Sequence, residues 1–164
     1  MRIFVYGTLL DPALLALVLG RPVERLAVTP AMLSGYRRRR ALGAWFPVLE
    51  PAAGGSVDGV VIEGLSAQDV ARLRYYETDA YELAACTVRV GGGQAEGGEI
   101  AAYVFQPTAA LSPSGEDWSI AAWPAAERDR ALAETKAFMA DFPIGGFPLG
   151  ARARPPALVS VLAA

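Results

Sequence analysis

The first predicted strand of this chain is apolar on both of its faces and stops at a glycine. Residues 3–6 are Ile, Phe, Val and Tyr, and Gly7-Thr8 follows at once. Because successive side chains of a strand point to opposite sides, a strand that is apolar on both sides lies between two layers of structure. The sequence therefore predicts a buried central strand that ends in a turn with unpaired backbone N–H groups. Such groups hold anionic parts of ligands, so we expect a substrate at this turn.

The size and charge of the chain limit the class of protein it can be. Its 164 residues, 53% of them hydrophobic, suffice for one well-buried core but not for two domains. A net charge of -2 gives no general attraction for nucleic acid or an anionic membrane. We therefore expect one domain over residues 1–164 whose partner is a small molecule, and we expect neither nucleic acid nor a membrane as a partner.

The residue types that are missing exclude several chemistries. The chain has no histidine, and Cys86 is its only cysteine. Catalysis by a serine or cysteine paired with histidine is thereby excluded, as are zinc sites built from imidazole or paired thiolates. We expect no metal and no cofactor, and we expect a carboxylate to move any proton. We expect a cytoplasmic location for three reasons. The chain has a single cysteine, we find no signal peptide, and no apolar run reaches the roughly 20 residues that span a bilayer.

Capping signals predict the helices. Asp11-Pro12 begins a helix that ends at Gly20, and Ser66 begins a second helix that runs to about Glu77. A third helical pattern starts at Trp118 and ends before Pro143.

Alternating and apolar runs predict the strands, and Gly-rich stretches predict the turns between them. The extended segments are residues 28–40, 45–49, 57–62, 86–90 and 100–105. A bend is predicted at 34–35 within the first segment, a hairpin loop at 51–56 and a turn at 91–98. We interpret residues 107–164 as a helical extension packed on the domain, with a loop-like tail from residue 143.

One carboxylate stands among tyrosines at the end of the second predicted helix. Glu77 follows Tyr75 and Tyr76 and precedes Tyr81. A carboxylate packed among these rings loses much of its hydration, and its proton affinity rises toward neutrality, as a general acid or base requires. The cluster by itself leaves open the commoner alternative, a solvated charge at a helix end with the tyrosines in the core.

The arginine run at residues 37–40 is a second charged feature. Alternate residues of a strand point to opposite faces, so the run forms no single patch, and we expect one of these arginines to pair with an acid. An RNA-associated domain that uses this run is a further alternative, and it predicts affinity that falls steeply with salt.

Five short motifs in a fixed order resemble the gamma-glutamylcyclotransferase-like family, also called AIG2-like. They lie within residues 2–106, at 5–10, 33–37, 46–51, 57–59 and 73–81. The resemblance implies an α+β fold, a small mixed β-barrel with flanking helices, whose cavity holds a gamma-glutamyl group. It also implies an enzyme that releases 5-oxoproline from gamma-glutamyl compounds.

The resemblance places the site residues on particular positions of this chain. The family's acid/base glutamate falls on Glu77, and its substrate-binding residues fall on Tyr6, Gly7, Thr8, Leu9 and Tyr81. The substrate's own α-amine attacks its γ-carbonyl, so one carboxylate can move the proton and no cofactor is needed. The sequence leaves open what is attached to the gamma-glutamyl group.

Three positions around Glu77 depart from the family's pattern. Arg74, Tyr76 and Thr78 stand where the family commonly has Asp, Phe and Gly. A cation at Arg74 is expected to lower the proton affinity of the carboxylate, and loss of the glycine is expected to change the turn. The alternative function is a non-catalytic small-molecule binding protein that keeps the same cavity.

Overall fold

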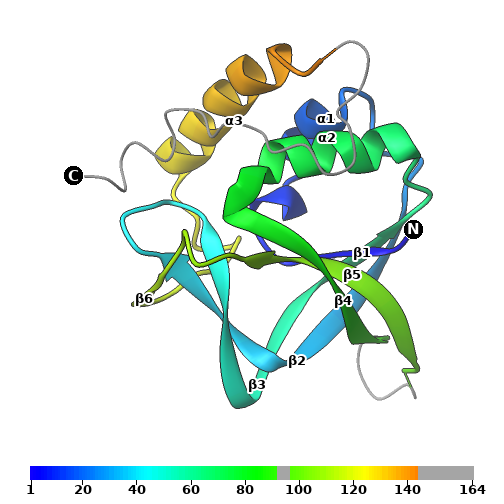
Figure 1. Ribbon diagram of the computed structural model, residues 1–164, viewed down its shortest axis with the longest axis vertical. Helices are drawn as coiled ribbons and strands as arrows, with labels where there is room; N and C mark the ends of the chain where they lie inside the picture. The colour runs from blue at the N-terminus through cyan, green and yellow to red at the C-terminus, as the bar shows by residue number, and fades with distance from the viewer. Residues whose placement is uncertain (92–96, 144–164) are drawn as a thin grey trace.

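Five strands close into a small mixed barrel (Figure 1). They are β1 (Ile3–Val5), β2 (Ala27–Ala41), β3 (Pro47–Glu63), β4 (Tyr81–Val90) and β5 (Glu99–Pro107). The order around the sheet is β3-β1-β5-β4-β2, and pairing of β2 with β3 closes the ring. β1 runs parallel to β5, whereas the other neighbouring pairs of the ring are antiparallel. This computed structural model describes residues 1–91 and 97–143 and confirms the predicted fold class.

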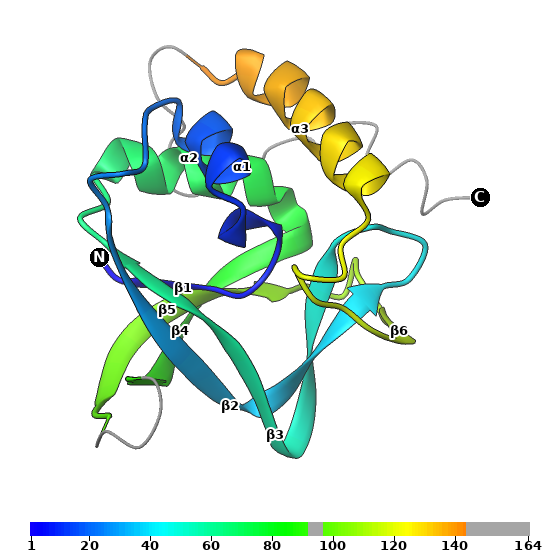
Figure 2. The same cartoon turned by 180° about the vertical axis from the view of Figure 1, so that it is seen from behind.

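The three described helices lie over the same end of the barrel, as the two opposite views in Figures 1 and 2 show. They are α1 (Pro12–Leu19), α2 (Ala67–Glu77) and α3 (Ala125–Ala140). α1 packs against both α2 and α3. Two short 3-10 helices, η1 (Thr8–Leu10) and η2 (Thr78–Ala80), follow β1 and α2.

The position of β1 between two parts of the core explains why both of its faces are apolar. Ile3 and Val5 pack into the core between the barrel and the helices, whereas Phe4 packs into the core inside the barrel. All three side chains are buried. The prediction of a buried central strand is therefore confirmed.

The predicted helix starts are also confirmed. Asp11 Oδ1 accepts hydrogen bonds from the N–H groups of Ala13 and Leu14 at 2.9 and 3.1 Å, and Gly20 ends α1 with φ +67°. At α2, Ser66 and Asp69 form a capping box in which each side chain accepts from the backbone N–H of the other.

The structure differs from the predicted strands and third helix at several places. Residues 51–56 form no hairpin loop, because β3 continues through them opposite a bend in β2, with Gly35 and Gly54 at positive φ. Residues 113–117, for which no strand was predicted, form β6 (Pro113–Asp117), which pairs with β2. The third helix begins at Ala125 rather than Trp118. Residues 92–96 of the predicted turn and the tail from residue 144 lie outside the described residues.

The turn after Glu77 carries backbone strain. Thr78 has φ +59° and ψ -157°, and it is the only non-glycine residue with positive φ in the described part of the chain. This region is essentially reserved for glycine, and a residue with a Cβ held there costs about 1–3 kcal/mol. The Thr78 hydroxyl accepts a hydrogen bond from the N–H of Ala80 at 3.2 Å. The chain therefore makes the turn that a glycine would make, at a cost in stability.

Replacing Gly59 with alanine is expected to destabilise the barrel. A Cβ at Gly59 would lie 2.3 Å from the carbonyl oxygen of Val5 and within 2.8 Å of the Phe4 ring. We predict that Gly59→Ala lowers the free energy of unfolding by about 2–3 kcal/mol in urea titrations. Gly115→Ala is the control, because a Cβ there meets no atom within 4 Å; equal effects of the two substitutions would contradict the close packing of β1 on β3.

Replacing Thr78 with glycine is expected to stabilise the protein. Glycine removes the strain that positive φ imposes on a residue with a Cβ. This gain in the free energy of unfolding exceeds the loss from one missing hydrogen bond and from the greater freedom of the unfolded chain, so the net gain is about 1 kcal/mol. Thr78→Ala keeps the strain and loses the hydrogen bond, so it is expected to destabilise. Chemical denaturation of both variants tests this, and a Thr78→Gly protein no more stable than Thr78→Ala would show that the turn is unstrained.

Candidate functional site

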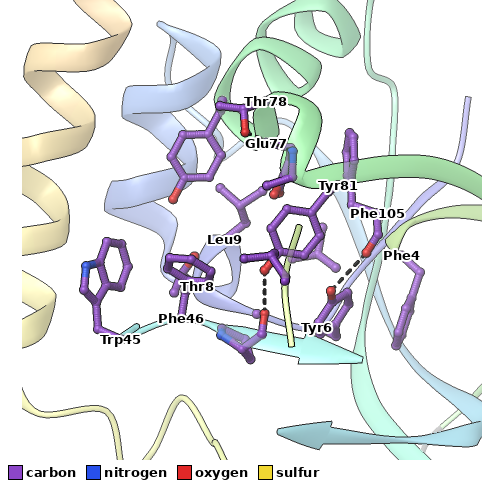
Figure 3. Close-up of a pocket in the computed structure, with 16 residues that line it drawn as sticks. Phe4, Tyr6, Thr8, Leu9, Trp45, Phe46, Glu77, Thr78, Tyr81 and Phe105 are labelled. Carbon is purple, nitrogen blue, oxygen red and sulfur yellow. Dashed lines mark hydrogen bonds between the residues drawn. The ribbon is translucent and has the colours of Figure 1, made fainter. Parts of the chain in front are cut away.

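A pocket opens at the end of the barrel that the helices cover. Its cavity volume is about 100 Å³, several times the roughly 10–15 Å³ that a single water needs. The six residues predicted for the site all line it: Tyr6, Gly7, Thr8, Leu9, Glu77 and Tyr81. Figure 3 shows Glu77 at the end of α2, just above the Tyr81 ring in this view. Residues far apart in the sequence are thus brought to one cavity.

Glu77 reaches the pocket because both ends of α2 are fixed. At the first turn, Arg21 Nε and Nη2 donate to the two carboxylate oxygens of Asp69 at 2.9 and 2.8 Å. These hydrogen bonds lower the pKa of Asp69 to about 2, so the pair stays ionised. At the last turn, the buried Leu73 anchors the helix in the core before Glu77 ends it.

Burial raises the pKa of Glu77 to about 8. The described part of the chain gives this carboxyl no ion-pair partner, and desolvation therefore acts unopposed. The expectation that Arg74 would lower its proton affinity was wrong, because burial alone accounts for the direction of the shift. A carboxyl group with this pKa both accepts and releases a proton near neutral pH.

The loop after β1 is held from two sides. The Tyr6 hydroxyl donates to the carbonyl oxygen of Phe105 at 3.0 Å, and Arg38 Nη1 donates to the carbonyl oxygen of Tyr6 at 2.9 Å. Gly7 lies so close to Pro47 that a Cβ would come within 2.9 Å of its ring. These contacts hold the loop in place beside the pocket.

The backbone N–H groups of this loop are available to a ligand. Thr8 and Leu9 form the first turn of η1, where a helix offers no acceptor for the N–H groups. The described residues give the N–H groups of Gly7, Thr8 and Leu9 no hydrogen-bond acceptor. The prediction of unpaired N–H groups at this turn is therefore consistent with the geometry.

Tyrosine hydroxyls surround Glu77 and stay protonated. The Tyr81 hydroxyl donates to the carbonyl oxygen of Pro47 at 2.8 Å (Figure 3). Burial, with the nearby Glu77, raises the pKa of Tyr6 well above its ordinary value and that of Tyr76 to about 12. Burial also raises the pKa of Tyr81. Glu77 is thus the group in the pocket that titrates near neutral pH.

The sequence analysis missed the aromatic end of the pocket, which we define as Trp45 and Phe46. Both residues lie in the loop between β2 and β3, for which a strand was predicted, and both line the pocket. The signal that was available is an aromatic pair directly before a proline. Leu111, from the segment before β6, was also missed.

Most of the arginine run is engaged in ion pairs. Arg38 contacts Asp58 at 2.9 Å, Arg39 contacts Glu50 at 3.1 Å, and Arg40 contacts Glu127 at 2.6 Å. The expectation that at least one of these arginines pairs with an acid is confirmed.

Two further observations concern membranes and metals. Within residues 1–91 and 97–143, no helix has the length and hydrophobicity needed to cross a lipid bilayer. The same residues contain no group of three or more cysteine, aspartate or glutamate side chains placed to hold a metal ion.

Sequence comparison identifies relatives of this chain. The family model described as gamma-glutamyl cyclotransferase, AIG2-like, matches residues 3–120. Protein AIG2 C of Arabidopsis thaliana is 35% identical over 81 residues, which cover 49% of this chain and 47% of that protein. AIG2-like protein C of the same plant is 26% identical over 137 residues, covering 84% of this chain and 77% of the relative. The chain thus matches about half the length of the first of these relatives.

Solved structures share the fold at low sequence identity. The solution structure of an Arabidopsis thaliana protein has a TM-score of 0.59 at 24% identity, covering 85% of this chain and 90% of that one. A structure named gamma-glutamyl cyclotransferase has a TM-score of 0.53 at 17% identity, covering 99% and 96%. A yeast cyclotransferase described as specific to glutathione has a TM-score of 0.53 at 12% identity, covering 99% and 94%. With the family model matching most of its length and the barrel agreeing with these folds, the chain belongs to the gamma-glutamyl cyclotransferase, AIG2-like family.

Proposed function

We propose that this protein is a gamma-glutamyl cyclotransferase with Glu77 as its general acid/base. The observation that carries the proposal is the half-buried Glu77, whose carboxyl lines a pocket without a cation and has its pKa raised to about 8 by desolvation. Family membership and the likeness to structures named cyclotransferases support it. The reaction is an intramolecular aminolysis that releases 5-oxoproline and a free amine or amino acid.

The proposed reaction moves one proton and exchanges one bond. The α-amine nitrogen of the substrate attacks its own γ-carbonyl carbon, a ring C–N bond forms, and the C–N bond to the leaving amine breaks. Glu77 takes the proton from the attacking nitrogen and passes it to the leaving nitrogen. No water, metal or cofactor takes part, because the nucleophile belongs to the substrate and already lies close to the carbonyl.

The loop after β1 would hold the anionic part of the substrate. The N–H groups of Gly7, Thr8 and Leu9 can donate either to the α-carboxylate or to the carbonyl oxygen on which negative charge develops. The hydroxyl oxygens of Tyr6 and Tyr81 donate their protons to backbone carbonyls, so they can accept hydrogen bonds from the substrate amine. Each predicted site residue therefore has a chemically suitable role.

The first experiment measures 5-oxoproline release from gamma-glutamyl amino acids, gamma-glutamyl amines and glutathione. We predict that Glu77→Gln lowers the rate by about a hundredfold or more, because general acid/base catalysis contributes about that much. Glu82→Gln is the matched control, because this exposed carboxylate on β4 does not line the pocket. If the folded wild-type protein binds these compounds but releases no 5-oxoproline, the non-catalytic binding protein is the correct alternative.

The pH dependence of stability tests the state of Glu77 separately from turnover. A carboxyl with a pKa of about 8 in the folded state and about 4.5 in the unfolded state binds its proton more tightly when folded. The free energy of unfolding therefore falls as the pH rises from about 4.5 to about 8. We predict that Glu77→Gln, which carries no charge, gains thermal stability relative to the wild type across this range. A difference in melting temperature between Glu77→Gln and the wild type that stays constant from pH 4.5 to pH 8 would contradict the raised pKa.

A further inference from the structure

One cation outside the pocket is bonded to the loop that lines it. Arg38 lies on β2, and its side chain is only 10% exposed. It is not among the described residues that line the pocket. Its Nη1 nevertheless donates to the carbonyl oxygen of Tyr6 at 2.9 Å, at the point where the chain leaves β1 for the loop. A largely buried guanidinium therefore contacts the site loop from outside the pocket.

The Arg38 guanidinium is itself held in place. Its Nε donates to the carbonyl oxygen of Trp118 at 3.0 Å, and its Cζ lies 5.7 Å from the centre of the Trp118 ring. Nη1 also donates to the carbonyl oxygen of Asp58 at 3.0 Å, and Nη2 donates to the Asp58 carboxylate at 2.9 Å. Because the donors of a guanidinium are fixed in one plane, these bonds set its position. The bond to Tyr6 is thus made at a defined place before any ligand binds.

This bond determines the direction of the next backbone N–H. The carbonyl of Tyr6 and the N–H of Gly7 belong to one peptide unit, and the described residues contain no cis peptide bond. In a trans peptide these two groups point in opposite directions, so the Gly7 N–H points away from the guanidinium. Gly7 lines the pocket, whereas Arg38 does not. A glycine restrains the rotation of its own backbone weakly, so an external contact is needed to keep the N–H in one direction.

The same bond makes the Gly7 N–H a stronger donor. Hydrogen bonds in a chain polarise one another, and a cation at the carbonyl draws electron density away from the N–H of the same peptide. Solvent screens this effect little, because the guanidinium is largely buried. The described residues offer the Gly7 N–H no acceptor of its own. A ligand oxygen at this position would meet a donor that is already oriented, at no cost of reorganisation.

We propose that Arg38 is a positioning residue of the site, which holds the Tyr6–Gly7 peptide with the Gly7 N–H turned toward the pocket to bind an oxygen of the gamma-glutamyl group. This inference rests on the proposed function. Arg38 acts through the peptide and does not touch the substrate. Its effect is the same whether the bound oxygen belongs to the α-carboxylate or to the γ-carbonyl.

The first test removes the donors of Arg38. We predict that Arg38→Met lowers kcat/KM for 5-oxoproline release about tenfold to a hundredfold, because a small displacement of a substrate-binding group can cost about that much. Arg38→Lys is expected to recover part of the loss, since its ammonium can still donate to the Tyr6 carbonyl. Arg39→Met is the matched control: Arg39 is paired with Glu50 and Asp117, and among the described residues it has no hydrogen bond to the loop. Its kcat/KM should stay within about threefold of the wild type.

Asp58→Asn separates the bond to the loop from the ion pair. This variant removes the charge of a carboxylate that is 78% exposed, and it leaves Arg38 and the backbone acceptors in place. We predict a kcat/KM within about threefold of the wild type. A loss as large as that of Arg38→Met would overturn the proposal, because the site would then depend on the ion pair.

The choice of substrate provides a second readout. Gamma-glutamylalanine, gamma-glutamyl methylamide and glutathione share the gamma-glutamyl half and differ in the leaving group. Arg38→Met is expected to lower kcat/KM by the same factor for each of them that the wild type turns over. A loss confined to one leaving group would overturn the assignment of Arg38 to the gamma-glutamyl half while leaving the proposed function intact.

The direction of the Gly7 N–H can be measured without a substrate. Residual dipolar couplings of a weakly aligned sample report the direction of each backbone N–H relative to the barrel. We expect the Gly7 coupling of the wild type to agree with the structure. In Arg38→Met it should change while the couplings of the barrel strands stay the same. An unchanged Gly7 coupling, or strand couplings that change as much, would overturn the proposal.

The dipolar couplings also separate this proposal from the proposed function. If the folded wild-type protein releases no 5-oxoproline, the proposed function fails, and the Gly7 coupling alone decides whether Arg38 positions the loop. If Arg38→Met does not fold, Arg38→Lys takes its place in both measurements. Wild-type values of kcat/KM and of the Gly7 coupling in Arg38→Lys would then overturn the proposal.

Discussion

The partial burial of one carboxyl group without a positive partner is the constraint on which the site depends. An ionised carboxylate in such a place is costly, and Glu77 responds by holding its proton up to a pH of about 8. The fold maintains this burial by fixing α2 at both ends and by surrounding its last residue with tyrosine rings. Because the hydroxyls of Tyr6 and Tyr81 are committed to backbone carbonyls, the rings stay in place while the carboxyl titrates.

Strain at one residue accompanies this arrangement. Thr78 adopts a conformation that suits glycine, directly after Glu77. The neighbouring Ala80 N–H contributes a hydrogen bond that partly offsets the cost. The turn that the family commonly makes with glycine is thus kept here by a different residue, and the end of α2 still delivers its carboxyl to the pocket.

The sequence was sufficient where the physical cause is local. Asp11 and Gly20 delimit α1, and Ser66 with Asp69 begins α2, because caps act within a turn of the helix. The motifs around Gly7 and Glu77 pointed to residues that the fold brings to one pocket. The local tyrosines around Glu77 correctly indicated desolvation.

The features that escaped prediction have causes distant in the sequence. β3 continues past Gly54 because β2 pairs with it on both sides of the bend, and β6 exists because β2 offers it an edge. Trp45 is held at one end of the pocket by Trp123, which stacks against it from the segment before α3, and Phe46 packs edge-on against Trp45. No local pattern could show that these rings meet a cavity.

Titration of the Glu77 carboxyl carbon by NMR, with Glu77→Gln to assign the resonance, tests the central claim most directly. The account predicts a midpoint of about 8, set by burial without a countercharge. A midpoint near the ordinary value of 4.5 would contradict it, because such a carboxyl would be solvated or paired and would not be poised to move a proton near neutral pH.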